Sequence, residues 1–252
     1  MKALKAIAPI ALVALATVAI AHDGKHPASP AQVAAALAAP GRADQAGDDA
    51  RRHAAEVIAF TGAGPGSTVI DFLPGQGYWT RILSGVVGPT GHVYALWPAG
   101  GAKYAEKPLP ALRALGLANM TAEVLPTNRV AAPTPVDIVL TVQNYHDIPN
   151  KGVGEAGIDL LNKGVFDALK PGGTYVVIDH ADAPETGLSG TETKHRIDPA
   201  AVKAEVLKAG FVLAGESNAL ANSEDDHSKN VFDPAVRGHT DQFMLKFRKP
   251  LQ

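Results

Sequence analysis

The sequence predicts a single α/β domain with a seven-stranded, mostly parallel sheet, an antiparallel last strand and helices on both faces. A helical extension is expected before this domain, which should span residues 66–252. Strand-like and helix-like apolar periods alternate along most of the chain. The last two strands are joined by a loop too irregular for a crossover helix, which favours an antiparallel final pair. With 252 residues, of which 46% are hydrophobic, the chain is long enough to bury one core.

Residues 1–21 have the pattern of a cleavable secretory signal peptide. Lys2 and Lys5 precede an apolar run of about 15 residues, which is shorter than the ~20 residues needed to cross a membrane. An A-x-A cleavage site ends at Ala21, and polar residues begin at His22. We therefore expect cleavage after Ala21 and a periplasmic or secreted protein that is not attached to a membrane afterwards.

Residues 22–65 are expected to form a polar leader followed by helices. Ser29 or Pro30 should start a short alanine-rich helix that ends near Ala39. A second helix is expected over residues 43–60, because its apolar residues recur at helical spacing. The glycine-rich segment 61–66 precedes a strand rather than following one, so it is interpreted as a connector and not as a phosphate loop.

The remaining elements are predicted from the alternation of periods and from glycine and proline positions. The expected strands are Val69–Leu73, His92–Leu96, Met120–Leu125, Pro135–Val142, Thr174–Asp179, Val212–Glu216 and Gln242–Phe247. The expected helices are Tyr78–Val87, part of Ala102–Leu115, Ile158–Leu169 and Pro199–Ala209. Pro108 and Pro110 should break the second of these helices or start a new one. The sequence L-K-P-G-G at Leu169–Gly173 is interpreted as the connection into the fifth strand.

Composition excludes several classes of function. The formal charge of -2 and the absence of a basic run argue against a nucleic-acid partner. With no cysteine, the protein has no disulfide, no thiolate catalysis and no cysteine-ligated metal site. A small-molecule substrate is therefore the expected partner, and the sequence does not indicate an oligomeric state.

The segment 69–84, V-I-D-F-L-P-G-Q-G-Y-W-T-R-I-L-S, predicts a strand, a glycine turn and a helix in direct succession. Such a turn at the carboxyl end of a parallel strand is typical of nucleotide-type cofactor sites. A dinucleotide site is disfavoured, since Thr80 occupies the third glycine position and no acid ends the second strand. A P-loop is excluded because no G-K-[ST] sequence follows the turn.

The order of elements, the glycine turn and the L-K-P-G-G sequence together resemble the class I S-adenosylmethionine-dependent methyltransferases, over residues 66–248. The signal peptide and four further sequences are similar to a family of exported bacterial "predicted methyltransferases". These sequences are P-G-Q-G-Y-W-T-R, Q-N-Y-H-D, H-R-I-D-P-A-A-V-K and N-V-F-D-P-A-V-R-G. The resemblance implies a Rossmann-like methyltransferase fold, S-adenosylmethionine as cofactor and methyl transfer to a small molecule.

The resemblance places the cofactor against the turn and the segment after the fourth strand. The implied cofactor-binding residues are Asp71, Leu73, Pro74, Gly75, Gly77, Tyr78, Trp97, Gln143 and Asn144. Two positions depart from the family pattern. Leu73 replaces the first glycine, and the acid that binds the ribose is absent from A-L-W-P-A-G after the second strand. Trp97 is a candidate for stacking on adenine, with a core or rim position as the alternative. Asp71 either faces the cofactor's ammonium group or pins the turn.

Candidate reacting groups follow the fourth and fifth strands, where the parallel sheet opens. The predicted catalytic residues are Tyr145, His146, Asp147 and His180. His146 is a candidate general base with its tautomer set by a carboxylate, and a structural histidine is the alternative. His195 and Arg196 return from a loop that could cover this rim. A second candidate lid contains Asp225, Asp226, His227 and Lys229, although a solvated loop is the default interpretation.

The prediction assigns no metal ligand, because no H-x-x-x-H or H-E-x-x-H motif is present. Two alternatives stay open. The rim histidines would suit a metal-dependent periplasmic enzyme, and an amino-terminal His22 with His26 would suit copper. A third alternative is a methyltransferase-fold protein that binds another ligand without methyl transfer.

Overall fold

The computed structural model describes residues 26–150 and 155–251. Within them the chain forms one seven-stranded sheet of order β3-β2-β1-β4-β5-β7-β6. Six strands run in parallel, and β7 is antiparallel to both of its neighbours. The strands are β1 Thr68–Phe72, β2 His92–Trp97, β3 Met120–Val124, β4 Val136–Val142, β5 Leu169–His180, β6 Val212–Ser217 and β7 Gln242–Arg248. The predicted fold class is confirmed. The predicted signal peptide and His22 lie outside the described residues.

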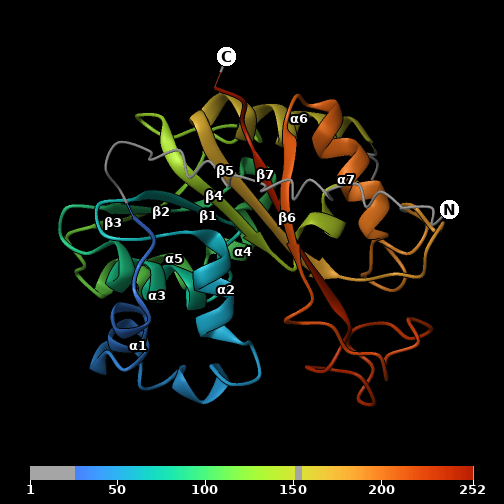
Figure 1. Cartoon of the computed structure of the whole chain (residues 1–252), viewed down its shortest axis with the longest axis horizontal. Coiled ribbons are helices and arrows are strands. Elements are labelled where there is room, and N and C mark those ends of the chain that lie inside the picture. Colours follow the sequence, from blue (N-terminus) through green and yellow to red (C-terminus); the bar gives the residue numbers. More distant parts are fainter. Residues whose placement is uncertain (1–25, 151–154, 252) are drawn as a thin grey trace, which may run out of the picture.

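Helices cover both faces of the sheet (Figure 1). On one face lie α1 Pro30–Leu37, α2 Ala54–Thr61, α3 Tyr78–Val87, α4 Ala102–Ala105 and α5 Pro108–Ala114. The opposite face carries α6 Glu155–Ala168 and α7 Pro199–Lys208. Short 3-10 helices lie between these elements: η1 Pro40–Arg42, η2 Ala46–Asp48, η3 Ala99–Gly101 and η4 Tyr145–Asp147. None of the helices in the described ranges is long and apolar enough to cross a membrane.

Successive residues of a strand point to opposite faces, so each central strand contributes to two cores. In β1, Val69 packs in the cluster with α1, α2 and α3, whereas Ile70 and Phe72 pack in the cluster with α6 and α7. Asp71 faces the same side as Val69 and is the buried polar residue of this strand, with only 2% of its surface exposed. This alternation aims the Asp71 carboxyl at the start of α3.

The helix that follows the glycine turn is amphipathic and has the predicted bounds. Ile82, Leu83 and Val86 face the sheet and are nearly fully buried. On the other surface of α3, the segment before α2 is attached by polar contacts. Tyr78 Oη donates a hydrogen bond of 2.6 Å to Asp49, and the Arg81 guanidinium forms an ion pair with Asp44 at 2.6 Å. The amino-terminal extension therefore packs directly against the helix that opens the site.

Two predicted elements differ in the structure. The helix expected over residues 43–60 is replaced by η2 and the shorter α2, because His53 adopts a left-handed conformation (φ 45°) that interrupts helical geometry. The L-K-P-G-G connection belongs to β5 itself. Its strand pairing runs from Leu169 opposite Val136, through an irregularity, to Thr174 opposite Ile138. Gly172 (φ 72°) lies within this irregular stretch, where only glycine adopts such a backbone without strain.

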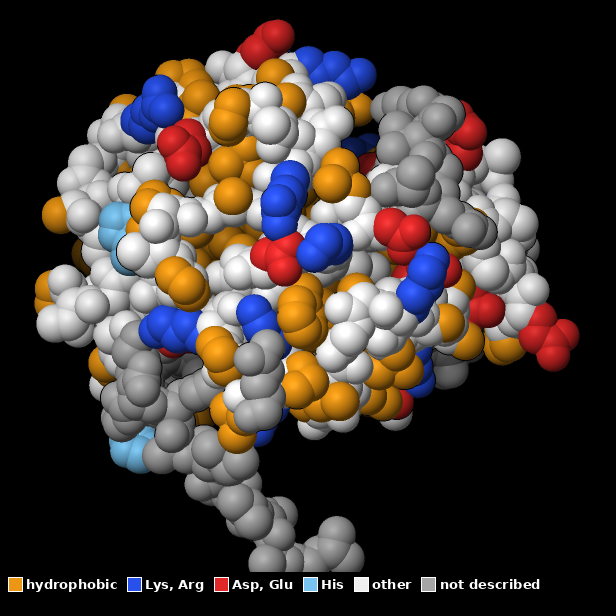
Figure 2. All heavy atoms as spheres, turned by 90° about the horizontal axis from the view of Figure 1, so that it is seen from above, with side chains coloured by type: hydrophobic (Ala, Val, Ile, Leu, Met, Phe, Trp, Pro, Cys, Tyr) orange, Lys and Arg blue, Asp and Glu red, His pale blue; other side chains and the backbone are white. Residues whose placement is uncertain are grey.

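The exposed surface carries charges of both signs. Seen from above, Lys and Arg side chains alternate with Asp and Glu side chains, and the view has no extended area of one sign (Figure 2). Hydrophobic side chains are scattered between them. This distribution agrees with the small net charge of -2.

Candidate functional site

The order of strands reverses direction between β1 and β4. In open α/β sheets, ligands bind outside the carboxyl ends of the strands at such a switch point. Here the glycine turn follows β1 and the segment Gln143–Asp147 follows β4. The two sets of residues that the sequence predicts for cofactor and chemistry are thus neighbours across the switch point.

The glycine turn has an unusual backbone. Leu73 (φ 56°), Gly75 (φ 55°) and Gly77 (φ 75°) are all left-handed, and Gly77 N–H donates to Pro74 O at 2.9 Å. A Cβ at Gly77 would overlap the Leu112 side chain of α5, whereas a Cβ at Gly75 would meet nothing within 4 Å. Leu73 carries a Cβ, and the left-handed conformation costs such a residue about 1–2 kcal/mol. Strain of this kind concentrates at functional sites.

Asp71 pins the turn to α3. Its carboxylate accepts a hydrogen bond of 2.6 Å from Thr80 Oγ1 and a second one from the Thr80 backbone. Burial raises the pKa of Asp71 to about 7, and the hydrogen bonds from Thr80 offset part of this effect. The structure therefore gives Asp71 the turn-pinning role, which was one of its two predicted roles.

Asn144 joins the two loops at the switch point. Its Nδ2 donates to Leu73 O at 3.0 Å and to Val142 O at 2.6 Å. The neighbouring Gln143 has a left-handed backbone (φ 58°), and its side-chain amide donates to Gln242 Oε1 at 3.0 Å. Both loops thus leave their strands through a left-handed residue and are held together by one amide group.

His146 is oriented by the carboxylate that ends β5. His146 Nδ1 lies 2.7 Å from Asp179 Oδ1, and its backbone N–H donates to Asp179 Oδ2 at 2.8 Å. Burial opposes protonation of the imidazole, but the charge and hydrogen bond of Asp179 and the charge of Asp147 together outweigh it and raise the pKa of His146 above 6.5. The same pairing outweighs burial at Asp179 and lowers the pKa of that carboxyl below 3.8. Since Asp179 accepts from Nδ1–H, the Nε2 lone pair is left for another group.

His146, Asp147 and His195 form a cluster at this rim. Asp147 Oδ1 lies 3.7 Å from His146 Nε2 and 3.5 Å from His195 Nδ1. The two imidazole rings are perpendicular, with centroids 5.4 Å apart, and His195 has a left-handed backbone (φ 57°). Phe232 packs against the His195 ring with centroids 5.0 Å apart. His146 and Asp147 follow β4 and His195 follows β5, so residues 49 positions apart in the sequence are brought together at the carboxyl ends of two neighbouring strands.

The other predicted catalytic residues, Tyr145 and His180, form contacts of their own, with Tyr145 buried and His180 half-buried. Tyr145 is fully buried on the α6 face, where its hydroxyl accepts from Asn162 Nδ2 at 2.8 Å, and burial raises its pKa above 10. His180 Nδ1 lies 2.7 Å from Thr240 Oγ1, and burial lowers the pKa of His180 to about 4, which keeps the imidazole neutral. Tyr145 therefore packs the core beneath the rim, while the His180 ring lies 5.9 Å from that of His146.

Two aromatic residues predicted at the cofactor are enclosed by protein. Trp97 is 1% exposed and packs with Ala95, Ala105 and Leu112, so it occupies the core position that was the alternative to adenine stacking. Tyr78 is 6% exposed and turned toward Asp49. In the conformation described, neither ring offers a face to a ligand. Pro74 is likewise buried, whereas Gly75 lies at the surface.

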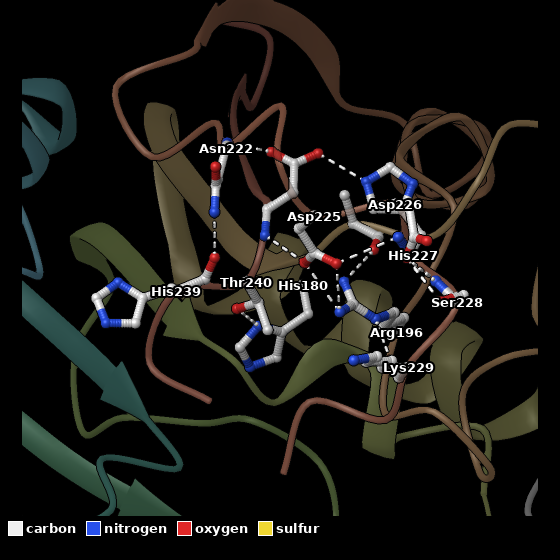
Figure 3. A network of polar contacts seen from close by, with 12 residues as sticks. His180, Arg196, Asn222, Asp225, Asp226, His227, Ser228, Lys229, His239 and Thr240 are labelled. Carbon is white, nitrogen blue, oxygen red and sulfur yellow. Dashed lines mark hydrogen bonds and ion pairs between the residues drawn. The ribbon is translucent and has the colours of Figure 1, made fainter. Parts of the chain in front are cut away.

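The second candidate lid, the loop with Asp225, Asp226, His227 and Lys229, is held by a network of polar contacts (Figure 3). Arg196 is fully buried and donates to Asp225 Oδ1 at 3.0 Å, to Ala181 O at 3.0 Å and to Lys229 O at 2.8 Å. Asp225 also accepts from Asp241 N–H at 2.7 Å. The solvated loop expected by default is therefore wrong for Asp225. Asp226 accepts a hydrogen bond from Ser228 of the same loop. His227 Nε2 lies 2.9 Å from the carboxylate of Asp241, where the loop ends.

No protein-family model and no curated protein matches this sequence. The structure, however, is similar to solved structures. A putative sarcosine dimethylglycine methyltransferase from Galdieria sulphuraria has a TM-score of 0.59 at 14% identity, over 82% of this chain and 88% of that one. The (4+2)-cyclase SpnF has a TM-score of 0.58 at 15% identity, over 90% and 98%. A SAM-dependent methyltransferase from Aquifex aeolicus has a TM-score of 0.52 at 18% identity, over 87% and 98%. The chain has the fold of class I methyltransferases.

Sequence reasoning missed three residues that shape this site. Asp179 enters the sequence analysis only as the end of the fifth strand, and in the structure it is the carboxylate that orients His146. Thr80 was considered only as a missing glycine, and it is the partner of Asp71. Leu112 gave no signal in the sequence, because its contact with Gly77 depends on how α5 packs.

Proposed function

We propose that this protein is an S-adenosylmethionine-dependent methyltransferase that acts on a small molecule in the periplasm. The observation that carries the proposal is the pair of loops at the switch point, joined by the hydrogen bond from Asn144 to Leu73 O. The fold and the glycine turn support this choice of cofactor. The signal-peptide pattern of residues 1–21 supports the compartment, in line with the exported bacterial family that the sequence resembles.

Methyl transfer asks little of the protein beyond alignment, because the sulfonium already makes the methyl group electrophilic. The glycine turn would hold the amino-acid portion of the cofactor, with Gly75 and the backbone around it accessible at the surface. The methyl acceptor would then lie on the side of His146, Asp147 and His195. In this arrangement Tyr145 supports the rim from the core, and His180 lies beside His146 with its Nδ1 bonded to Thr240.

A second candidate is a protein of this fold that binds a different ligand. It is favoured by the enclosed Trp97 and by the lack of an acid in the segment after β2. The (4+2)-cyclase among the similar structures illustrates that one fold serves different reactions.

Calorimetric titration of the mature protein with S-adenosylmethionine and S-adenosylhomocysteine tests the proposal, with adenosine as the comparison ligand. We expect one site per chain with a micromolar dissociation constant for the first two compounds. Absence of binding at millimolar ligand would overturn the methyltransferase proposal and leave the second candidate. Mass spectrometry of the exported protein tests the compartment, since the expected first residue is His22.

A further inference from the structure

The rim cluster combines two imidazoles and one carboxylate from two separate loops. Within the described residues, His146, Asp147 and His195 are the group whose possible ligand atoms all lie within 4.8 Å of one another. Two of the three pairs are separated by 3.5 and 3.7 Å. Ligands of a tetrahedral zinc ion are about 3.3 Å apart, given bond lengths of ~2.0–2.1 Å. The two pairs that include Asp147 are therefore slightly wider than in a closed site, and the pair of histidines, within 4.8 Å, would have to approach to bind an ion.

An independent feature is the carboxylate behind His146. Asp179 is fully buried and holds both Nδ1 and the backbone N–H of His146. This is the carboxylate–histidine arrangement that fixes the tautomer and the ring orientation of metal-ligating histidines. It directs the Nε2 lone pair toward Asp147 and His195.

The charges around the cluster also favour a cation. Asp147 and Asp179 bring two negative charges to a rim where the adjacent basic residues are engaged elsewhere. Lys194 forms an ion pair with Asp182, and Arg196 is held by Asp225. Both basic residues flank His195 in the sequence without neutralising Asp147.

We propose that His146 Nε2, Asp147 Oδ1 and His195 Nδ1 form a binding site for a divalent transition-metal ion of the zinc type. Imidazole and carboxylate ligands suit such ions, whereas Mg²⁺ prefers an all-oxygen set. Three protein ligands leave at least one coordination position for water or an oxygen-containing substrate. Such an ion would polarise that oxygen. The site does not depend on S-adenosylmethionine, so it goes beyond the proposed function.

Zinc binding to the tag-free, chelator-treated mature protein tests the site without any activity assay. Calorimetry should show one Zn²⁺ per chain, and His195→Ala and Asp147→Asn should each weaken binding at least tenfold. His53→Ala is the matched control, since His53 is exposed beside Glu56 at 4.0 Å, outside the cluster, and should bind Zn²⁺ like the wild type. Asp179 is not one of the proposed ligands, yet Asp179→Asn should weaken Zn²⁺ binding by about 10–100-fold, because Asp179 orients His146.

Co²⁺ provides a second readout, because its visible absorption reports the geometry of the ligands around it. A d–d band should form in the wild-type protein and be absent in His195→Ala. Absence of zinc binding, equal binding in His195→Ala and Asp147→Asn, or equally tight binding of Mg²⁺ would each overturn the proposal. Unchanged binding in those two variants would also place the ion elsewhere, for example at His22 and His26. His195 is half-buried on a loop, so its replacement tests the site even if Asp179→Asn does not fold.

Discussion

The side-chain amide of Asn144 donates a hydrogen bond of 3.0 Å to the main-chain oxygen of Leu73. This bond joins the loops after β1 and β4 and holds Leu73 in its left-handed conformation. In Asn144→Ala we expect the free energy of unfolding to fall by about 1 kcal/mol, the usual net value of such a bond. The affinity for S-adenosylmethionine should fall about tenfold as the turn relaxes. Calorimetry and urea unfolding measure the two effects.

Asn128→Ala is the control for this prediction. Asn128 accepts a hydrogen bond of 2.7 Å from Gly100 N–H on the exposed surface. Its replacement should change stability by no more than about 1 kcal/mol and leave ligand affinity unaltered. Equal affinities in Asn144→Ala and the wild type would contradict a role for Asn144 in shaping the site.

Gly77 and Gly75 should differ sharply in their tolerance of a methyl group. Gly77→Ala adds a Cβ that overlaps Leu112 in a left-handed backbone, so we expect a loss of about 2–4 kcal/mol. Gly75→Ala has the same backbone strain but open space, so about 1–2 kcal/mol is expected. Thermal unfolding of both variants distinguishes them. Similar losses would show that backbone strain alone governs the turn.

Asp71 should make stability fall as the pH rises toward neutrality. The pKa of Asp71 in the folded protein is about 7, above its ordinary value of 3.8, so the folded state binds this proton more tightly than the unfolded state. The resulting stabilisation is complete below about pH 4, declines up to about pH 7 and is absent above it, and amounts to ~4 kcal/mol at most. Asp71→Asn keeps an acceptor for Thr80 and lacks this titration.

Urea unfolding of the wild type and Asp71→Asn at several pH values checks this prediction. The two proteins should have similar stability near pH 4, and the variant should be the more stable above pH 7. A difference between the two that does not change with pH would mean that Asp71 is ionised throughout.

Arg196 should hold the loop 218–241 in place. Removing one partner of a buried ion pair costs about 3–5 kcal/mol, so Arg196→Met should lose about that much and expose the loop to protease. Arg129→Ala removes the exposed pair with Asp167 and should lose less than about 1 kcal/mol. Limited proteolysis with mapping of the cleavage sites provides the measurement. If the loop in Arg196→Met resisted the protease as in the wild type, contacts other than those of Arg196 would hold it in place.

Much of the fold follows from local patterns. Tyr78–Val87 is amphipathic and flanked by glycines at both ends, so its bounds are readable from the sequence. The helix expected over residues 43–60 shows the limit of that reading. Its apolar spacing is helical, yet contacts of Asp44, Gln45 and Asp49 with α3 and the turn stabilise an irregular path. Such contacts lie far apart in the sequence and leave no local periodicity.

The candidate site is predictable as a location and less so in its contacts. The rim of His146, His180 and His195 follows from the rule that ligands gather at carboxyl ends of strands. The partner of His146 and the position of Trp97 do not follow from that rule. Asp179 rather than Asp147 accepts from His146 Nδ1, and Trp97 turns into the core, because both outcomes depend on packing across the sheet.

The position of β7 between β5 and β6 constrains the order in which the sheet can close. β6 precedes β7 along the chain, but each of its strand-pairing partners in the sheet belongs to β7. During synthesis, which delivers residues from the amino end, β6 has no edge to pair with until residues 242–248 have been made. Until then β5 presents an open edge on which another chain could pair. Pairing of β5 with another chain is thus possible until β7 has been made. The open edge of β5 is therefore where a chaperone that binds unfolded chains would be most effective.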